Sequence, residues 1–389
     1  MVKHLSTRSL RMFRPLSEAW HRFLGVAGGG SPTTRSESKG VSIKSSGVKV
    51  GLKHIRGPSD ALSTQLVSQK KRTAVRAYSS EEVTKAMQQV LGTTEVSFRS
   101  PEQKQGLEAV LAGHTPLVVV LPMGGGKSLL FMAPACLQDP GVSVVVVPFR
   151  ALLGNMVKWM KEVKIECIEW KAGEANSATV VVVSADRATG WEFMNYASQL
   201  NRDKLLRRVI INECHLTFTS SDWRPKLAQV KNLRLLQCLM VLLTATLPPL
   251  AEVELGKAML IPLATYIWAS TVRANTRYTV QGCVRGKAEE TALAVCRRQQ
   301  ERLDGMKGVV YCWVRAQCED MACELGCPYY HAGVVDREGG LERWLDGGGW
   351  IIATSALRTG VDFPGIVFVL HVGLPHGMID YAQESGRAG

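Results

Sequence analysis

The sequence predicts an α/β protein with two tandem domains, each built on a parallel sheet, behind a basic N-terminal tail of residues 1–78. After the tail, short apolar runs alternate with stretches of helical length, as in sheets that helices cover on both faces. The length of 389 residues suits two to three domains. The runs lie at 117–121, 143–147, 180–184, 209–211 and 240–243 in a first series, and at 309–313, 329–331, 350–353 and 367–371 in a second.

A boundary between the two series follows from Pro248-Pro249 and from the stretch between Ser270 and Gly286, which lacks hydrophobic periodicity. We therefore expect a first domain over residues 79–268 and a second over 269–389.

The net charge of +13 is concentrated in the tail. Residues 1–76 hold 15 lysines and arginines against three acids, hence +12, whereas the remainder holds 32 against 31, hence +1. The basic balance is therefore no argument that the folded part binds nucleic acid. Ser, Gly and Lys dominate the tail, so we expect disorder there, apart from a short apolar helical face over residues 15–25.

Composition also bears on location. The first 35 residues are rich in Arg and Ser and hold one acid, which suits a mitochondrial transit peptide, although a flexible basic tail explains them as well and is the interpretation we prefer. No apolar run approaches the roughly 18 residues that a membrane span needs, so we expect no membrane partner. Ten scattered cysteines indicate reduced thiols in an intracellular protein.

Two helices are predicted ahead of the first strand. Ser79 and Glu82 have the spacing of a capping box, and the apolar stripe that follows ends at Gly92. Ser100-Pro101 begins a second helix, which Gly113 ends.

A glycine-rich loop follows the strand at 117–121 and precedes an apolar helix. Its residues are Gly124, Gly125, Gly126, Lys127 and Ser128. Glycines let backbone N–H groups surround a phosphate at a helix N-terminus, a lysine reaches the β- and γ-phosphates, and a hydroxyl binds Mg²⁺. Leu121 occupies the position where the strict form of this motif has its first glycine, but the strand and helix lie where the motif requires them. ATP and Mg²⁺ are therefore the expected cofactors.

A second motif follows the strand at 209–211. Two acids at such a strand end usually serve a phosphate loop, the first by holding Mg²⁺ and the second by orienting or deprotonating the attacking water. Here Glu213 supplies the second acid, whereas Asn212 replaces the first and keeps an oxygen ligand without its negative charge.

With these motifs in place, residues 79–389 resemble the core of a RecQ-like DNA helicase of helicase superfamily two, which implies two RecA-like domains. Phe98-Arg99 followed by Gln103 is similar to the adenine-binding motif of that family. The resemblance implies that Arg99 packs on the adenine and that Gln103 bonds its edge. Ser100 and Gln103 also have capping-box spacing, and both roles are compatible.

The resemblance extends to segments that contact DNA in the family. Residues 148–152 resemble motif Ia and residues 184–187 motif Ib, and both motifs contact the DNA strand in the family. Residues 218–225 resemble the aromatic-rich loop, which in the family couples single-stranded DNA to the ATP site, and residues 243–246 match motif III. A flat aromatic side chain suits single-stranded DNA because every base has a π-face, and this is the interpretation we prefer for Trp223, whose alternative is a core residue near a turn. The implied DNA contacts are Phe149, Arg150, Arg187, Phe218, Trp223, Arg224 and Thr354.

In the second domain, Gly360 and Asp362 resemble motif V and add to the implied nucleotide site. Residues 383–389 resemble the start of motif VI, which implies a catalytic role for Arg387 beside Lys127 and Glu213. The family motif continues with another arginine one residue beyond Gly389, and that arginine reaches the γ-phosphate.

The expected function is an ATP-dependent, 3′→5′ DNA helicase that acts on single-stranded and duplex DNA, with a nuclear location and roles in DNA repair and recombination by family resemblance. Asn212 and the position of residue 389 within motif VI leave two alternatives open. One is a degenerate helicase that binds ATP and nucleic acid without turnover. The other is a fragment of a longer, active enzyme.

Overall fold

The structure is a computed structural model that describes residues 76–220, 224–270, 275–303, 305–358, 363 and 365–388. The predictions made for residues 1–75 of the tail, including the apolar helical face over residues 15–25, lie outside the described residues, as do Trp223, Gly360 and Asp362. Residues 76–78 precede α3 without regular secondary structure, and the Arg76 guanidinium donates to Glu82 at 2.9 Å.

The first sheet has seven parallel strands within the described residues, in the order β3-β4-β2-β5-β6-β1-β7. Its central strands are runs of Val, Ile and Leu, and such runs form strands because both faces of the sheet are buried. The predicted parallel sheet is confirmed. The strands are β1 (Leu117–Val120), β2 (Val142–Val147), β3 (Cys167–Glu169), β4 (Val180–Ser184), β5 (Leu206–Asn212), β6 (Leu239–Thr244) and β7 (Thr265–Trp268).

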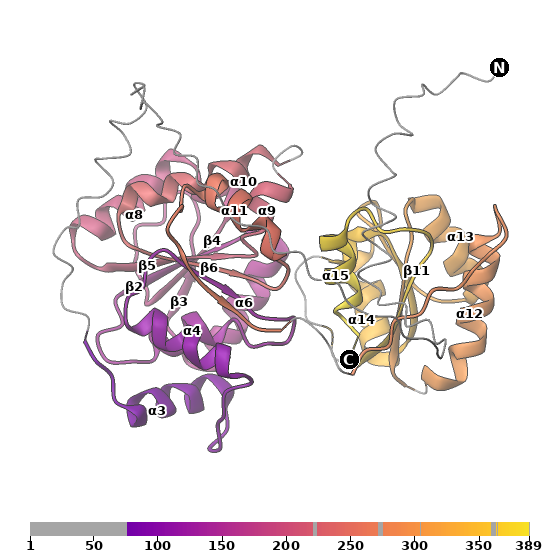
Figure 1. Cartoon of the computed structure of the whole chain (residues 1–389), viewed down its shortest axis with the longest axis horizontal. Helices are drawn as coiled ribbons and strands as arrows, with labels where there is room; N and C mark the ends of the chain where they lie inside the picture. Colours follow the sequence, from indigo (N-terminus) through magenta and orange to yellow (C-terminus); the bar gives the residue numbers. More distant parts are fainter. Residues whose placement is uncertain are drawn as a thin grey trace, which may run out of the picture. The chain divides into compact units, whose positions relative to one another are not determined.

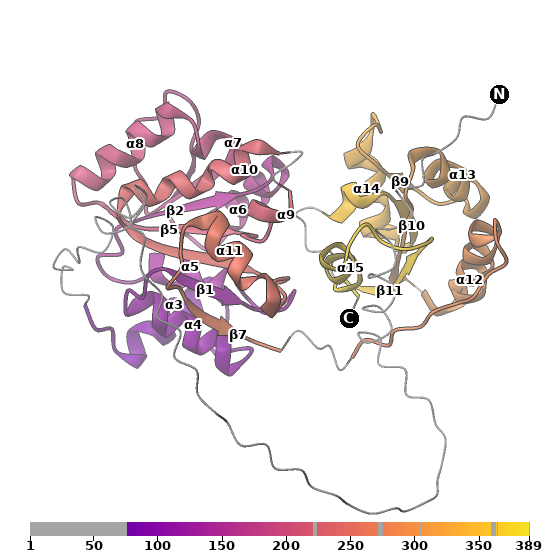
Figure 2. The ribbon, with the colours of Figure 1, turned by 45° about the horizontal axis from the view of Figure 1, so that its top comes forward.

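Helices cover both faces of this sheet (Figure 1, Figure 2). One buried cluster joins the sheet to α3 (Ser80–Leu91), α4 (Pro101–Leu111), α5 (Leu129–Ala135) and α6 (Arg150–Glu162). The other cluster joins the opposite face to α7 (Ala185–Ala188), α8 (Trp191–Arg202), α9 (Leu216–Thr219), α10 (Pro225–Gln229), η1 (Val230–Leu236), η2 (Pro249–Ala251) and α11 (Glu252–Met259).

The second sheet has four parallel strands within the described residues, in the order β11-β8-β10-β9. Helices again lie on both of its faces, with α12 and α13 packed in one cluster and α14 in another (Figure 2). The strands are β8 (Lys307–Tyr311), β9 (Tyr329–Tyr330), β10 (Gly349–Ala353) and β11 (Ile366–His371). The remaining elements are α12 (Ala288–Leu303), α13 (Arg315–Leu325), α14 (Arg337–Gly347), η3 (Ser355–Arg358) and α15 (Met378–Ser385).

The structure differs from the predicted elements in two ways. β3 and β7 were not predicted, because edge strands of three and four residues with mixed burial leave no apolar run. The second predicted helix ends at Leu111 with Ala112 as its cap, two residues before Gly113, whose left-handed φ of 73° turns the chain. The capping box of Ser79 and Glu82 and the helix end at Gly92 are confirmed.

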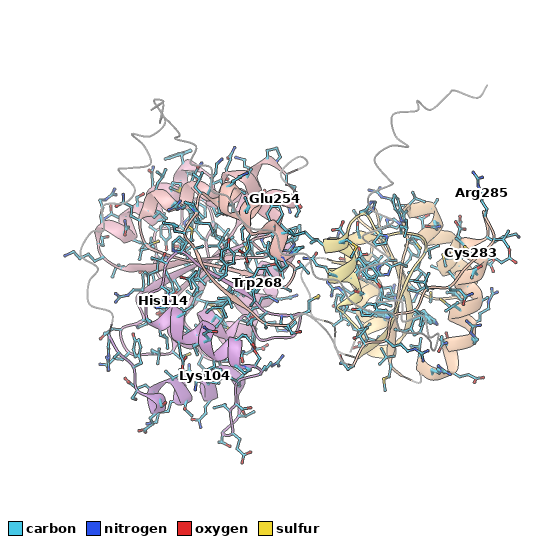
Figure 3. The ribbon with its side chains drawn as sticks, in the orientation of Figure 1. Lys104, His114, Glu254, Trp268, Cys283 and Arg285 are labelled. Atoms are coloured by element: carbon cyan, nitrogen blue, oxygen red, sulfur yellow. The ribbon has the colours of Figure 1, made fainter. Side chains whose placement is uncertain are left out.

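Residues 275–287 connect β7 to α12 without regular secondary structure. The side chains of residues 277–287, including Cys283 and Arg285, are exposed, whereas Trp268 at the end of β7 is partly buried (Figure 3). Among the described residues, none of the helices is both long and apolar enough to span a bilayer.

The packing of the second sheet predicts the effect of a single methyl group. A Cβ at Gly308 on β8 would lie 2.5 Å from the ring of Trp350, which is buried and packs edge-on against Phe368. We expect Gly308→Ala to lower the free energy of unfolding by about 1–3 kcal/mol, as overpacked cores do. Gly347→Ala on α14 is the control, because its Cβ would meet nothing within 4 Å. Chemical denaturation compares the two variants, and equal midpoints would contradict the expectation.

Candidate functional site

The glycine-rich loop connects β1 to α5, as predicted. Gly124 and Gly126 have φ values of 72° and 73°, in the left-handed region that glycine adopts without strain. Gly125 is needed for a different reason, because a Cβ there would lie 2.8 Å from the carbonyl oxygen of Pro122. The sequence thus forms a tight loop between β1 and α5, within which the backbone N–H of Gly125 donates to the carbonyl oxygen of Pro122 at 2.9 Å.

Lys127 and Ser128 follow the glycines. The Lys127 ammonium lies 3.4 Å from the carbonyl oxygens of both Leu121 and Pro122, so its side chain lies back across the loop. Ser128 is the residue before α5, and within the described residues its hydroxyl does not cap that helix.

Arg99 and Gln103 bind the glycine-rich loop directly, which the sequence did not predict. The amide of Gln103 donates to the carbonyl oxygen of Gly126 at 3.1 Å and accepts from the backbone N–H of Arg99 at 2.7 Å. The Arg99 guanidinium donates to the carbonyl oxygen of Gly124. The predicted capping contact is also present, because the Ser100 hydroxyl accepts from the backbone N–H of Gln103 at 3.1 Å. Gln103 is 3% exposed, so it acts as a buried connection between α4 and the loop.

Asn212 and Glu213 lie at the end of β5, in the sheet position that the second motif requires. Glu213 has a φ of 52°, a left-handed conformation that non-glycine residues adopt at a cost and that is common at functional sites. One of its carboxylate oxygens is buried and has no hydrogen-bond partner among the described residues, although it lies 3.5 Å from Nδ1 of His215. A buried carboxylate oxygen without a partner is costly, and a bound water or cation would relieve that cost.

The strand order places these groups together. β6 lies between β5 and β1, with Asn212 paired to Leu243 and Val120 paired to Thr244. The backbone N–H of Leu121, where the glycine-rich loop begins, donates to the carbonyl oxygen of Thr244 at 3.1 Å. Carboxyl ends of parallel strands form the usual ligand-binding edge of an α/β sheet.

Two neighbours of the acidic motif have structural roles. The ring of His215 is fully buried, and its Nδ1 lies 2.8 Å from the Thr244 hydroxyl, which connects the end of β5 to the end of β6. Cys214 is also fully buried, and burial raises the pKa of its thiol. The thiol therefore stays protonated at neutral pH and is a packing residue, not a nucleophile.

Arg224 connects the three segments that were expected to contact DNA. Its guanidinium donates to the carbonyl oxygen of Pro148 at 3.1 Å, pairs with the carboxylate of Asp186 at 3.2 Å and lies 4.9 Å above the ring of Phe149. Motif Ia, motif Ib and the segment after the acidic motif therefore meet at one side chain. The sequence named Arg224 and Phe149 but held no signal that they touch.

The other expected DNA contacts are placed as follows. Arg187 donates to Glu169 at 3.2 Å and to the carbonyl oxygen of Trp170 at 3.3 Å. Phe218 is partly buried against the core of the first sheet, so part of its surface serves packing. Thr354 follows β10, where its hydroxyl accepts from the backbone of Ala356 at 3.4 Å. Arg150 begins α6, and its side chain lies outside the described residues.

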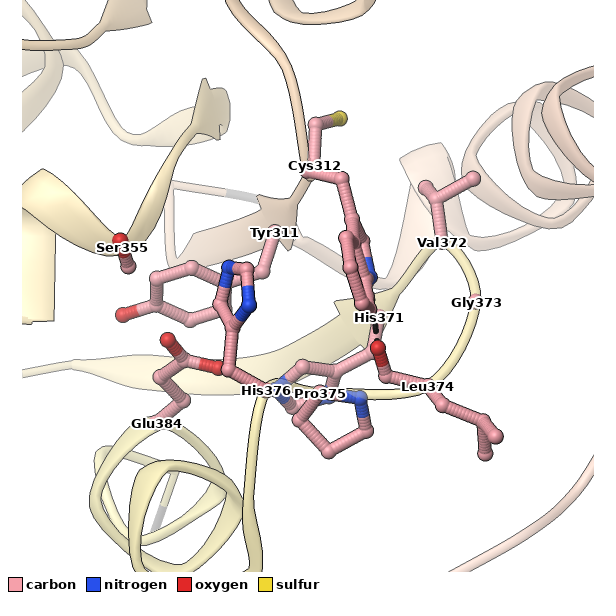
Figure 4. A pocket seen from close by; sticks show the side chains of 11 residues that line it. Tyr311, Cys312, Ser355, His371, Val372, Gly373, Leu374, Pro375, His376 and Glu384 are labelled. Atoms are coloured by element: carbon pink, nitrogen blue, oxygen red, sulfur yellow. Dashed lines mark hydrogen bonds and ion pairs between the residues drawn. The ribbon is translucent and has the colours of Figure 1, made fainter. Parts of the chain in front are cut away.

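A hydrogen-bonded histidine–carboxylate pair in the second domain was missed by the sequence. His371 at the end of β11 lies 3.0 Å from the carboxylate of Glu384 on α15, and both side chains are largely buried. His371 also stacks on Tyr311 with ring centroids 5.4 Å apart (Figure 4). Arg387 follows α15, with its guanidinium 5.1 Å from the ring centroid of Phe363. For His371 and Glu384, the one signal in the sequence was that Glu384 lies within motif VI, whose side chains the pair would help to position.

The chain is similar to helicases over most of its length. Residues 100–253 match the DEAD/DEAH box helicase family, and residues 290–389 match the helicase conserved C-terminal domain. The chain is 30% identical over 316 residues to the RecQ-like DNA helicase blm-1 of Caenorhabditis elegans. That alignment covers 74% of this chain and 31% of the worm protein. It is 27% identical over 317 residues to the ATP-dependent helicase SGS1 of Saccharomyces cerevisiae, which covers 74% of this chain and 22% of that protein.

The chain thus spans a third or less of the length of these two relatives. Among solved structures, the helicase MrfA bound to DNA has a TM-score of 0.62 at 16% identity, covering 86% of this chain and 54% of that one. A likeness at this identity concerns the fold alone, and it agrees with the two parallel sheets.

The contact between Gln103 and the glycine-rich loop predicts a pair of unequal glycine substitutions. Gly124→Ala and Gly126→Ala share the same unfavourable φ, but only the second places a Cβ against another side chain, where it would overlap Nε2 of Gln103. We expect Gly126→Ala to lose about 1 kcal/mol more stability, because the buried amide must move and lose its hydrogen bond.

Thermal unfolding of both variants, alone and combined with Gln103→Ala, measures this difference. The extra loss should disappear in the Gln103→Ala background. Its persistence there would show that the loop itself, and not the Gln103 contact, is responsible.

Proposed function

Because the chain carries the two domains of a superfamily-two helicase core and is similar to RecQ-like helicases, we propose that it is an ATP-dependent DNA helicase core of RecQ type. One observation supports the proposal above the others. The glycine-rich loop, Glu213 and Thr244 lie at adjoining ends of β1, β5 and β6, where a nucleotide triphosphate would meet all three.

In this proposal the loop binds the phosphates of ATP. Backbone N–H groups around Gly124–Gly126 surround the phosphates, and Lys127 turns from the carbonyl oxygens of Leu121 and Pro122 toward the β- and γ-phosphates. Arg99 and Gln103 sit against the same loop and place the adenine beside it. Glu213 holds the attacking water through its buried carboxylate oxygen.

Mg²⁺ fits this arrangement as a partner of the nucleotide. The described residues contain no cluster of three or more His, Cys, Asp or Glu that could hold a metal ion alone. Mg²⁺ commonly binds one or two protein oxygens together with substrate phosphates, and the oxygens of Ser128 and Asn212 would serve here. When bound, the ion would neutralise charge on the phosphates as the terminal bond breaks.

DNA binding is proposed for the surface that Arg224 organises. Phe149 and Arg224 supply an aromatic face and a cation at the junction of motifs Ia and Ib, and such pairs suit single-stranded DNA. Thr354, Gly360 and Asp362 would continue the sites in the second domain, and Arg387 would act on the terminal phosphate. Translocation in the 3′→5′ direction and duplex unwinding complete the proposal, and a nuclear location agrees with it.

A second candidate function is favoured by Asn212. An amide at this position lacks the charge that holds Mg²⁺ against the phosphates. The alternative is therefore a protein that binds ATP and nucleic acid with little or no turnover.

Nucleotide binding through Lys127 tests what both candidates share. We expect Lys127→Ala to weaken ATP binding about 10- to 150-fold, because it removes a charge-assisted contact of about 1.5–3 kcal/mol. Titration calorimetry with Mg²⁺ and ATP measures the effect. Lys85→Ala is the control, because Lys85 is exposed on α3 and its ammonium pairs with Glu81 on the same helix. Equal affinities of the Lys127 variant and the parent would refute the nucleotide site.

Turnover separates the two candidates. An active helicase core should release phosphate at ~1 s⁻¹ or faster with saturating single-stranded DNA, the low end of typical enzyme rates. We expect the parent to be slower, and Asn212→Asp to lower the Mg²⁺ concentration needed for half-maximal ATP binding by about tenfold, because a carboxylate holds Mg²⁺ better than an amide does.

Asn195→Asp adds the same charge on the exposed face of α8 and should change neither quantity. A parent that already turns over at ~1 s⁻¹ would exclude the candidate without turnover.

A further inference from the structure

Trp313 is a half-exposed aromatic side chain that the structure nevertheless holds firmly. It follows β8 and is 50% exposed. Its indole N–H donates to the carbonyl oxygen of Leu374 at 2.5 Å, and its backbone N–H donates to the side chain of Gln317 at 3.2 Å. Its ring lies 4.4 Å from that of His376, at an angle of 41°. The exposure is therefore a property of a fixed ring and does not come from a loose side chain.

The surroundings of this ring are open and apolar. Val314, the next residue in the sequence, is 57% exposed. Leu374, whose carbonyl oxygen accepts from the indole N–H, is 62% exposed. Trp313 also lines a cavity of only about 20 Å³, which is room for one water, so the indole is not the lid of a buried pocket. Leu374 and His376 line the same cavity (Figure 4). A ligand for this position must approach from solvent and offer a flat face.

The position along the sheet favours nucleic acid. Trp313 stands at the carboxyl end of β8, the edge at which open parallel sheets bind their ligands. Two residues on, the Arg315 guanidinium lies 3.0 Å from the Cβ position of Gly333, in the segment after β9. β10 separates β8 from β9, so the guanidinium lies further along the same edge of the sheet and does not cover the indole. A flat apolar face and a cation spaced along one edge match a base and a phosphate of a nucleotide chain.

We propose that Trp313 is a stacking platform for an unpaired base of single-stranded DNA, with Arg315 facing an adjacent phosphate. The inference rests on the proposed nucleic-acid function and adds to it a base contact in the second domain. The base must be unpaired, since a duplex keeps its base faces stacked inside. Because a hydrogen bond to Leu374 and a ring contact with His376 already hold the indole, stacking would cost little side-chain entropy.

The test compares two oligonucleotides on the full chain. One is a fluorescently labelled dT oligomer, and the other has the same length with abasic residues throughout. Trp313→Leu keeps the bulk of the side chain without its π-face, and Trp313→Phe keeps a smaller face. We expect the leucine variant to bind the dT oligomer about 5- to 100-fold more weakly, the range for one stacked base, and the phenylalanine variant to lose less. On the abasic oligomer the parent and both variants should bind alike.

Controls separate this inference from the proposed function. Trp191→Ala removes a tryptophan that is 73% exposed on α8 and should change neither affinity. A parent that fails to bind the dT oligomer would refute the proposed function and the platform with it. A parent that binds, together with a leucine variant that binds equally well, or that loses as much on the abasic oligomer, would overturn the platform alone. A leucine variant that loses affinity for ATP and keeps its affinity for the dT oligomer would overturn the platform as well. In that case Trp313 would stack on the base of a free nucleotide and not on a base of DNA.

Discussion

The hydrogen-bonded register of β5, β6 and β1 is the constraint on which the candidate nucleotide site depends. The Leu121 N–H bound to the Thr244 carbonyl oxygen fixes where the glycine-rich loop starts, and the pairing of Asn212 with Leu243 fixes where the acidic motif ends. Side chains of these strands are buried on both faces of the sheet. A shift of one residue in the pairing would move every side chain of a strand from one face to the other, and such a shift is strongly disfavoured. Packing far from the site therefore sets the positions of its polar groups.

Local contacts at the site are made at some cost. The left-handed backbone of Glu213 and its buried carboxylate oxygen are both unfavourable in isolation, and the packed strand ends around them maintain both. Polar side chains elsewhere join segments that are distant in the sequence. Gln103 binds α4 to the glycine-rich loop, and Arg224 binds motifs Ia and Ib. Gln103 and Arg224 thus hydrogen-bond to protein groups where water would otherwise bind. Their contacts hold the loops in place at the positions where we expect a ligand to bind.

Much of the fold was predictable from local patterns. Runs such as Val180–Ser184 identified the buried strands because their apolar character extends to both faces, and Ser79 with Glu82 identified a helix start through a contact three residues apart. β3 and β7 were not predictable, since edge strands are short and half exposed. Strand order was not predictable either, because no local pattern records which strands become neighbours.

The sequence by itself determined the residue types of the site. Composition and spacing reveal the three glycines before Lys127, and they reveal that Asn212 stands where the motif has an acid. Each feature is a property of a few adjacent residues. Only the tertiary structure decided which of these residues meet. The contact of Gln103 with Gly126, the three partners of Arg224 and the exposure of Trp313 all join segments far apart in the chain. Such contacts depend on how strands are ordered and helices are packed, and that order arises from the whole core.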